Sequence, residues 1–199
     1  MRRIRDRLRK LYGRPLPAPH RRPVDELVRT ILSQHTSDRN RDRAFERLRE
    51  RFPPAGGAGQ ARVGEPEVEW AAVRDAPVEE VEEAIRPGGL SRQKAPRIQR
   101  ALELIGDELD LDWLETAPRE EAIGFLCALP GVGRKTAACI QIFTWDIPEI
   151  PVDVHVHRVG GRLGLFREKA PLDQAHDEML AITDPADAYE FHMNLIRHG

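Results

Sequence analysis

A lysine and an aspartate 18 residues apart, Lys135 and Asp153, are the side chains of this sequence best suited to covalent chemistry. Lys135 follows residues 129–134 (LPGVGR), where two glycines flanking one valine predict a tight turn between two helices. A lysine in the first turn of a helix lies at the positive end of the helix dipole, which disfavours its ammonium form. Because a neutral amine is a nucleophile that forms Schiff bases, the pair makes this sequence a candidate enzyme.

The same two residues permit a simpler interpretation. Asp153 could accept the proton of the Lys135 amine and stabilise a positively charged sugar, but its charge also favours the ammonium form, so the two influences oppose each other. In the alternative, Lys135 only binds phosphate, and Asp153 is the N-cap of a helix over residues 154–163. Residue types alone leave both interpretations open.

The glycine turn itself predicts a phosphate site. A turn of this kind beside a helix N-terminus directs backbone N–H groups outward, where they can hold an anion. Arg134 and Lys135 add positive charge at the same place. We therefore expect this segment to bind a nucleic-acid backbone through Gly131, Val132, Gly133, Arg134 and Thr136.

Residues 129–137, residues 152–159 and the step from Lys135 to Asp153 together resemble the helix-hairpin-helix DNA glycosylase superfamily, and within it the endonuclease III branch. Residues 27–38 (LVRTILSQHTSD), 88–98 (GGLSRQKAPRI) and 191–199 (FHMNLIRHG) match that family in the same order. In this family the lysine distinguishes glycosylases that also cleave the abasic strand. The resemblance therefore implies a bifunctional glycosylase and abasic-site lyase of base excision repair, whose partner is double-stranded DNA with a damaged base or an abasic site.

The resemblance also implies a mechanism. Lys135 would attack the sugar C1′ as the base leaves, with Asp153 activating the amine and stabilising charge on the sugar. The Schiff base makes the C2′ proton acidic, so that β-elimination breaks the strand on the 3′ side. We expect this chemistry to require no metal and no other cofactor.

A glycosylase must turn the damaged nucleotide out of the helix and fill the gap. Residues 88–91 (GGLS) match the wedge loop of the family, which implies that Leu90 intercalates beside Ser91 and that Lys94 holds phosphate. A simpler interpretation, compatible with this one, is that the two glycines end the preceding helix and that Leu90 is a hydrophobic staple.

A second gap-filling side chain is expected in residues 33–38 (SQHTSD), where the family carries a glutamine. An ungapped alignment places His35 at that position, and Gln34 lies one residue earlier. Both remain candidates, with Asp38 nearby as a pocket or helix-capping residue. Because this segment contacts the flipped or the orphaned base, oxidised pyrimidines are the default substrate, and deaminated or mismatched bases stay open.

Endonuclease III relatives usually continue beyond the segment matching residues 191–199 into a four-cysteine loop that holds a [4Fe–4S] cluster. This sequence ends at Gly199, and its two cysteines, Cys127 and Cys139, lie in apolar helical segments where we expect reduced core residues. We favour a truncated chain over a form without the cluster, and expect a cluster only if the native protein continues past Gly199.

Helical periodicity predicts an all-α fold. In residues 24–32 the apolar side chains recur at i, i+3, i+4, i+7 and i+8, which is typical of a core-facing helix. Similar stripes fall at residues 45–48, 78–85, 98–105, 122–126, 137–143, 154–163, 172–182 and 189–196. Residues 152–157 are the one short strand candidate, and residues 53–64 predict a flexible loop. The resemblance implies two lobes, residues 23–147 and residues 1–22 plus 148–199, with the DNA cleft between them.

Charge is uneven along a chain whose formal net charge is −2. Residues 1–22 and 86–100 are basic, whereas residues 65–83 and 107–121 are acidic, which predicts one DNA-facing side. No apolar run reaches membrane-spanning length and no signal peptide is visible. We expect a monomer in the cytoplasm, associated with the nucleoid in a prokaryote.

Two other classes of function deserve a test. A metal-dependent hydrolase could use Asp153, His155 and His157, because a His-x-His step presents two imidazoles on one side of a strand. On a helix these two histidines do not face each other, which removes that geometry. The other class is a non-catalytic or monofunctional relative that binds or senses damaged DNA.

Overall fold

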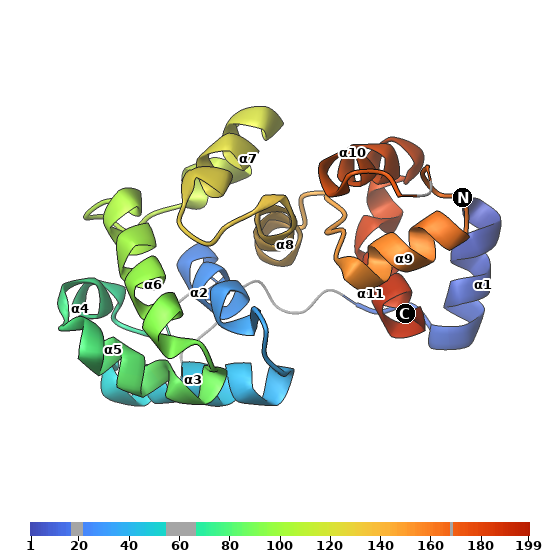
Figure 1. Ribbon diagram of the computed structural model, residues 1–199. Helices are drawn as coiled ribbons and strands as arrows, with labels where there is room; N and C mark the ends of the chain where they lie inside the picture. Colours follow the sequence, from blue (N-terminus) through green and yellow to red (C-terminus); the bar gives the residue numbers. More distant parts are fainter. Residues whose placement is uncertain (17–21, 55–66, 168) are drawn as a thin grey trace. The chain divides into compact units, whose positions relative to one another are not determined.

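The computed structural model describes residues 1–16, 22–54, 67–167 and 169–199, and within these ranges it contains helices and no strand, as the all-α prediction requires (Figure 1). None of the helices in this described part has the length and apolar character needed to cross a membrane. The chain divides into two compact units, Met1–Ala18 with Ala137–Gly199, and Pro19–Thr136. This division falls inside helix α8 (Arg134–Trp145), and the lobe boundary at residue 147 stays a prediction.

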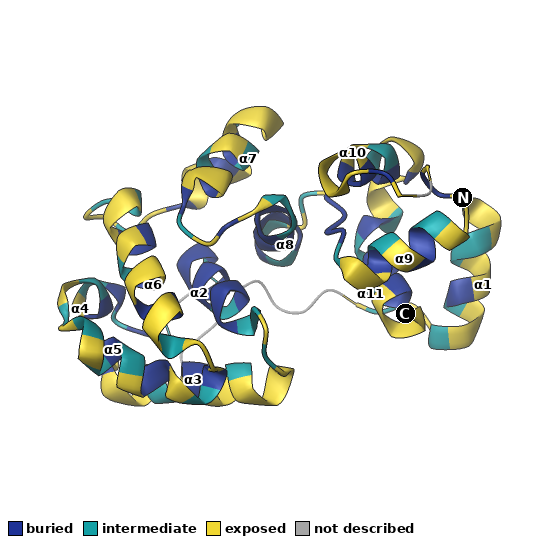
Figure 2. Cartoon of the chain, viewed as in Figure 1, coloured by how far each residue is buried: buried dark blue, intermediate teal, exposed yellow. Residues whose placement is uncertain are grey.

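The unit of residues 19–136 forms around helix α2 (Pro23–Ser33), which begins with a proline at a position that needs no N–H donor. Helices α3 (Asp38–Arg51) and α6 (Ser91–Ile105) pack against α2. Nearly the whole of α2 is buried, including the predicted apolar stripe (Figure 2). Since each fully buried aliphatic side chain contributes about 1.5–3 kcal/mol, α2 is a firm anchor for the loop of residues 34–37 that follows it.

Short elements complete this unit. Helix α5 (Val78–Ile85) packs on α3 and α6, and helix α4 (Trp70–Asp75) packs on α6. The 3-10 turn η1 (Arg86–Gly88) follows α5 directly and contacts α3, so the chain reaches the start of α6 after two residues. The turn η2 (Asp112–Glu115) and helix α7 (Arg119–Ala128) then lead to the glycine turn before α8.

The second unit joins the two ends of the chain. Helix α11 (Ala188–His198) packs against α1 (Arg2–Tyr12), α9 (Val154–Arg162) and the turn η3 (Pro185–Asp187), and α10 (Leu172–Ile182) precedes that turn. Its core includes Leu8, Val156, Met179 and Phe191. The guanidinium of Arg9 donates two hydrogen bonds of 2.7 Å to the carboxylate of Glu190. This bidentate pair connects α1 to α11 across 181 residues of sequence.

One sequence expectation about secondary structure is wrong. The strand candidate at residues 152–157 is helical from Val154 onward, because the side chain of Asp153 caps α9 and so satisfies two of its free N–H groups. Within the predicted loop of residues 53–64 only Pro53 and Pro54 belong to the described residues, and the remainder lies outside them.

A buried carboxylate in α2 makes the stability of the fold depend on pH. Asp25 is 1% exposed, and it accepts a hydrogen bond of 2.7 Å from the indole N–H of Trp70. Burial raises the pKa of Asp25 from 3.8 to about 6, against the opposing effect of the Trp70 hydrogen bond. Because the folded-state pKa is raised, this contribution to stability is complete below about pH 4 and is lost as the pH rises through about 6.

Replacing Asp25 with asparagine keeps an acceptor for Trp70 and removes the charge. Between pH 4.5 and pH 7.5 we expect the wild type to lose about 2 kcal/mol of unfolding free energy relative to D25N, because only the wild type carries the buried carboxylate. Urea unfolding of both proteins at the two pH values measures this shift. An unchanged difference would show that Asp25 is not the titrating group.

Candidate functional site

The glycine hairpin, residues 131–133, connects α7 to α8 as the sequence predicts. The N–H of Val132 donates to the carbonyl of Leu129 at 3.0 Å, and the Val132 side chain is buried, which anchors the tip of the turn. Gly131 has φ +82°, a backbone conformation that side chains rarely adopt. Helix α8 then begins at Arg134, so the hairpin lies directly before a helix N-terminus.

The two glycines serve different purposes. Gly133 lies outside the left-handed region, and a Cβ added there would meet nothing within 4 Å. The expectation that both glycines avoid backbone strain is therefore right for Gly131 and wrong for Gly133. Open space beside an exposed Gly133 leaves the backbone accessible to a ligand as large as a phosphate group.

Lys135 occupies the first turn of α8 and is half-buried. Its Nζ makes no hydrogen bond and no ion pair with any residue that the structure describes. The positive end of the helix dipole adds no stabilisation to an ammonium at this position. Thr136, which follows, is buried, so its side chain belongs to the packing of α8 and not to the exposed surface of the hairpin.

Asp153 belongs to the other unit and is half-buried at the start of α9. Its Oδ1 accepts hydrogen bonds from the backbone N–H of His155 at 2.9 Å and of Val156 at 2.7 Å, which confirms the predicted N-cap. Its Oδ2 accepts no hydrogen bond from the described part of the chain. One carboxylate oxygen therefore holds the helix, and the other is available to a substrate.

The loop of residues 34–37, between α2 and α3, connects to the glycine hairpin. The side-chain amide of Gln34 donates a hydrogen bond of 2.7 Å to the carbonyl of Gly131, 97 residues away. The next residue, His35, is exposed and has φ +52°, a left-handed conformation that is uncommon for a side chain of this size. In this structure Gln34 holds the hairpin, and His35 forms the exposed tip of the loop.

Asp38 does not cap a helix. The N-cap of α3 is Ser37, whose side chain accepts from the N–H of Asn40, and Asp38 is the first residue of the helix proper. The exposed carboxylate of Asp38 pairs with Arg41 at 2.9 Å. The capping half of the prediction is therefore wrong, since serine one position earlier supplies the cap.

The loop of residues 88–91 presents an apolar side chain at its tip. Leu90 is 48% exposed and has φ +50°, between Gly89 with φ +67° and Ser91 at the start of α6. A leucine in this conformation costs roughly 1–2 kcal/mol relative to the right-handed region. An exposed leucine held in a strained backbone is typical of functional sites, where the surrounding structure enforces the strain.

The prediction that Lys94 holds a phosphate is wrong for this structure. Lys94 is 1% exposed, and its Nζ donates hydrogen bonds to the carbonyls of Leu32 at 2.7 Å and Gly88 at 2.8 Å. Burial lowers the pKa of this amine. Because the ammonium faces the protein interior, it cannot contact DNA without leaving both carbonyls unpaired.

Arg97 is the residue near the hairpin that motif reasoning missed. A Cβ placed on Gly131 would lie 3.4 Å from Cδ of Arg97, so the Arg97 side chain passes directly beside the hairpin. Its neighbours Arg86 and Arg100 pair with Glu83 and Glu103, whereas Arg97 has no acidic partner among the described residues. The basic stretch of residues 86–100 contained this signal, but nothing local relates residue 97 to residue 131.

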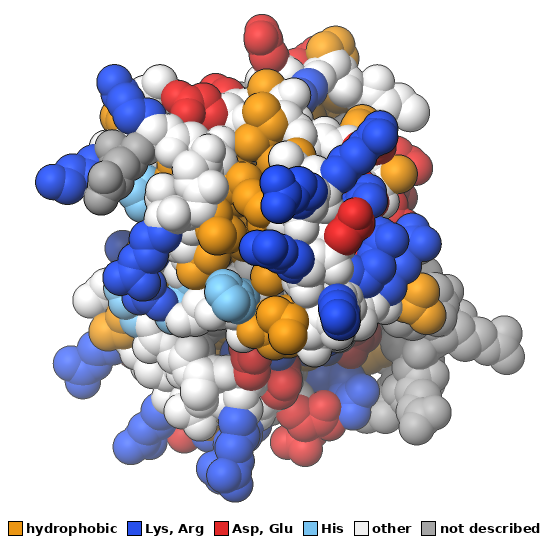
Figure 3. Space-filling model, turned by 90° about the vertical axis from the view of Figure 1, so that its right-hand side faces the viewer, with side chains coloured by type: hydrophobic (Ala, Val, Ile, Leu, Met, Phe, Trp, Pro, Cys, Tyr) orange, Lys and Arg blue, Asp and Glu red, His pale blue; other side chains and the backbone are white. Residues whose placement is uncertain are grey.

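Basic side chains elsewhere are partly neutralised. In α1, Arg5 pairs with Asp6 and Asp187, and Arg9 pairs with Glu190. Figure 3 shows lysine and arginine side chains spread over the face drawn there, with hydrophobic side chains exposed between them. The basic N-terminal stretch therefore supports the fold of its own unit, in addition to any role at the surface.

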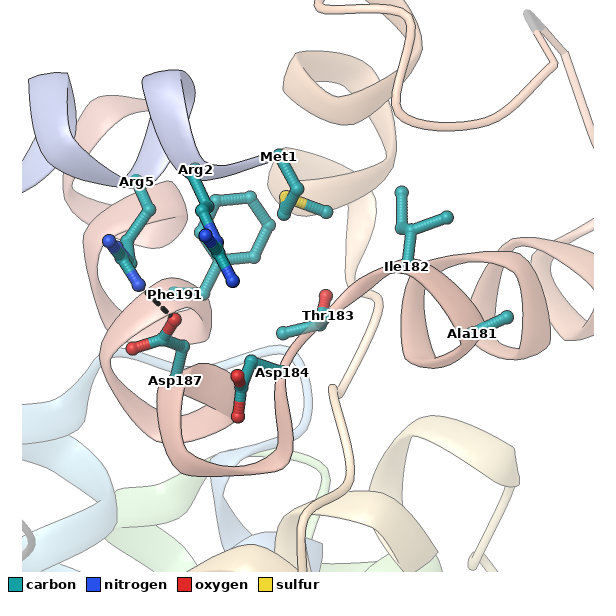
Figure 4. Close-up of a pocket in the computed structure, with 9 residues that line it drawn as sticks. All are labelled: Met1, Arg2, Arg5, Ala181, Ile182, Thr183, Asp184, Asp187 and Phe191. Atoms are coloured by element: carbon teal, nitrogen blue, oxygen red, sulfur yellow. Dashed lines mark hydrogen bonds and ion pairs between the residues drawn. The ribbon is translucent and has the colours of Figure 1, made fainter.

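A pocket of about 320 Å³ lies between α1 and the turn η3. Figure 4 shows Arg5 directed at Asp187 across this pocket, which Met1 and Phe191 also line. It contains none of the predicted site residues. Its ion pair fixes α1 to η3, and the pocket is not a candidate for the base-binding site.

The histidines of α9 are not arranged as metal ligands. His157 Nε2 lies 2.8 Å from the carbonyl of Ala170, and His155 Nδ1 lies 3.2 Å from a guanidinium nitrogen of Arg158. Across the described residues, no group of three or more His, Cys, Asp or Glu side chains could hold a metal ion. The helical geometry thus removes the strand arrangement on which the hydrolase alternative depended.

The cysteines do not fit an iron–sulfur cluster. A [4Fe–4S] cluster of this family requires four thiolates, and the chain has two cysteines. Cys139 is buried in α8 as expected, whereas Cys127 is exposed on α7, so the expected core position is wrong for Cys127; the two belong to different units of the chain. The reaction proposed for Lys135 and Asp153 has no step that uses a cluster.

Comparison with known proteins agrees with this geometry. The chain is 34% identical over 194 residues to endonuclease III of Synechocystis, covering 96% of this chain and 78% of that protein. It is 30% identical over 179 residues to a protein of Arabidopsis thaliana named as a DNA glycosylase, covering 88% of this chain but only 56% of the plant protein. A solved endonuclease III, trapped as a covalent intermediate with DNA, superimposes with a TM-score of 0.77 at 28% identity, covering all of this chain and 84% of that one.

The sequence model of one family matches residues 28–184, which include the glycine hairpin, Lys135 and Asp153. The fold, the hairpin and the identities over most of the chain agree with this match. The chain therefore belongs to the HhH-GPD superfamily of base excision DNA repair proteins, as a DNA glycosylase of the endonuclease III kind.

Proposed function

We propose that this protein is a bifunctional DNA glycosylase and abasic-site lyase that acts on double-stranded DNA. The observation that carries the proposal is the amine of Lys135, which has no partner among the described residues and lies two residues after the glycine hairpin, in the first turn of α8. The endonuclease III that was trapped covalently on DNA, and whose fold this chain matches over its full length, supports the same reaction here.

The covalent steps follow from one amine and one carboxylate. Nζ of Lys135 forms a bond to C1′ as the bond from C1′ to the base breaks, and the base leaves with that electron pair and takes up a proton. One proton of that nitrogen then passes to the ring oxygen O4′, and opening of the sugar ring gives a hydroxyl group and a protonated Schiff base. Loss of the C2′ proton and departure of the 3′ phosphate oxygen break the strand. Asp153 stabilises the positive charge that develops on the sugar through its free Oδ2.

The 34–37 loop, the 88–91 loop and the glycine hairpin have different roles in this proposal. We place His35 and Leu90, both exposed at left-handed loop tips, in the gap left by the flipped nucleotide. Gln34, whose amide already donates to Gly131, holds the hairpin instead of entering the DNA. The backbone of the hairpin, with Arg134 beside it, binds the phosphates.

The expected lesion is an oxidised pyrimidine, and product analysis on a panel of duplexes tests both the lesion and the reaction. Each duplex carries one oxidised pyrimidine, one deaminated base or one mismatch, and free base and cleaved strand are measured separately. Release of base with matching strand cleavage is expected for an oxidised pyrimidine. Release of base without cleavage would remove the lyase step, and release of neither product from a bound duplex would indicate a damage-sensing protein.

Arg97 gives a separate prediction about DNA binding. If it supplies one phosphate contact beside the hairpin, R97A should weaken binding equally for all sequences and should reduce the slope of log affinity against log salt by about 1. Fluorescence anisotropy over a salt series measures the slope. R100A is the matched control, because it removes the same charge from the same helix at a residue already paired with Glu103. Equal slopes for the two variants would contradict the contact.

A further inference from the structure

The buried amine of Lys94 connects two helix ends that face different loops. Leu32 lies in the last turn of α2, and Gly88 is the last residue of η1. Carbonyl groups at the end of a helix have no partner within that helix. Lys94, in the second turn of α6, donates to one such carbonyl from each end, at 2.7 and 2.8 Å. A cation beside helix C-termini is also favoured by the helix dipole.

Each of these carbonyls lies just before an exposed loop tip. His35 follows Leu32 by three residues, and Leu90 follows Gly88 by two. Both tips have left-handed backbones, with φ +52° at His35 and +50° at Leu90. Such short connections have little freedom, so the position of each tip depends on the position of the carbonyl that precedes it.

The contact between the two anchors is tight. A Cβ added at Gly88 would lie 3.1 Å from Cβ of Ala44 and 3.8 Å from Cδ2 of Leu32. The backbone of η1 therefore packs directly on α3 and on the side chain of Leu32 in the last turn of α2. With Lys94 1% exposed beneath them, the two loop bases and α6 form one closely packed assembly.

We infer that Lys94 is a positioning residue, which holds the 34–37 and 88–91 loops at a fixed separation so that His35 and Leu90 enter the base stack together. The inference rests on the proposed function, because it assigns Lys94 to the opening of the stack and not to the chemistry at Lys135. A lysine is suited to this role because one flexible amine satisfies two carbonyls at once, and the chain buries it completely to do so.

The test separates opening of the stack from the covalent step. A duplex with 2-aminopurine next to a paired lesion is made unreactive by a 2′-fluoro sugar at the lesion, which disfavours positive charge at C1′, and its fluorescence rises when the 2-aminopurine is unstacked. Borohydride trapping on a natural abasic site reports the Schiff base, where no base remains to be extruded and the cost of opening is small. Both are measured at saturating protein for the wild type and for Lys94→Met, whose unbranched side chain is one heavy atom shorter and lacks the donors.

For Lys94→Met we expect the fluorescence rise to be lost and base release from a paired lesion to fall by tenfold to a hundredfold, roughly the effect of a misplaced positioning group. Trapping on the abasic site should stay within about threefold of the wild type, since that site needs little opening. An equal loss in all three measurements by a folded Lys94→Met protein would show that Lys94 does not act on the loops selectively, and an unchanged fluorescence rise would show that Lys94 does not set the loops. Either result overturns the inference.

Two further variants keep the test decisive. Lys94→Met added to a variant that lacks both tip side chains, His35→Ala with Leu90→Ala, should show little additional loss, because Lys94 acts through those two tips, whereas additive losses would contradict this. Gly88→Ala leaves Lys94 intact and moves its acceptor away from Ala44, so it should reproduce the selective loss even if Lys94→Met does not fold. A wild type that opens the stack but gives no adduct would contradict the lyase proposal alone.

Discussion

Replacing Lys135 with alanine is expected to abolish the covalent adduct that borohydride traps on an abasic duplex, with a loss of strand cleavage of roughly a thousandfold or more. The amine is the one nucleophile that the proposed mechanism uses, and it makes no hydrogen bond or ion pair within the described residues whose loss would disturb the fold. Removing a cation from the first turn of α8 also relieves an unfavourable interaction with the helix dipole. Duplex binding should persist through the hairpin backbone and the neighbouring arginines.

Lys135→Arg is the matched control, since it separates the nucleophile from a phosphate-binding cation. A guanidinium keeps the positive charge but stays protonated and cannot form a Schiff base. The mechanism therefore predicts that the arginine variant binds duplex like the wild type and yields no adduct. Adduct or cleavage by the arginine variant at the wild-type rate would assign Lys135 to phosphate binding.

Asp153→Asn is expected to slow base release by about a hundredfold to ten-thousandfold, while the free energy of unfolding changes little. Asparagine is as good an N-cap as aspartate, so the two hydrogen bonds to the N–H groups of His155 and Val156 survive. A neutral amide cannot take a proton or stabilise a positive sugar at the position of Oδ2. Single-turnover base release, measured beside urea unfolding, distinguishes the two roles.

Asp153→Ala completes this comparison. This substitution removes both the cap and the charge. The Asp153→Ala protein should therefore be about 1 kcal/mol less stable than Asp153→Asn and should release base equally slowly. If the asparagine variant instead released base at the wild-type rate, Asp153 would be a cap alone. A role in the reaction could then not be assigned to it.

Features that depend on neighbouring residues were predictable from the sequence. The apolar stripe of α2 and the start of α9 at its aspartate cap both follow from local periodicity and local hydrogen bonding. The hairpin was predictable for the same reason, although the conformation of Gly133 was not, because a two-glycine motif does not say which glycine needs a positive φ.

The buried position of Lys94 differs from the expected phosphate contact, although the helical periodicity of α6 indicates it. Ile98, Ala101 and Leu102, four, seven and eight residues later, form the buried face of α6, and Lys94 lies on that same face. Its charge suggested a surface position and outweighed the periodicity. The contacts of Gly131 with Gln34 and Arg97 could not be predicted, since they join residues far apart in the sequence and depend on tertiary packing.

At His35 and Leu90, whose backbones are left-handed, selection for stability and selection for DNA repair favour different residues. Glycine at either tip would relieve strain, and asparagine would adopt the conformation more easily than leucine does. A library sorted only for resistance to heat or protease would therefore enrich glycine and asparagine at these two positions. The resulting proteins would be more robust and would have lost the side chains that we propose to fill the gap in DNA. Under that proposal, the present residues mark places where function has overruled conformational preference.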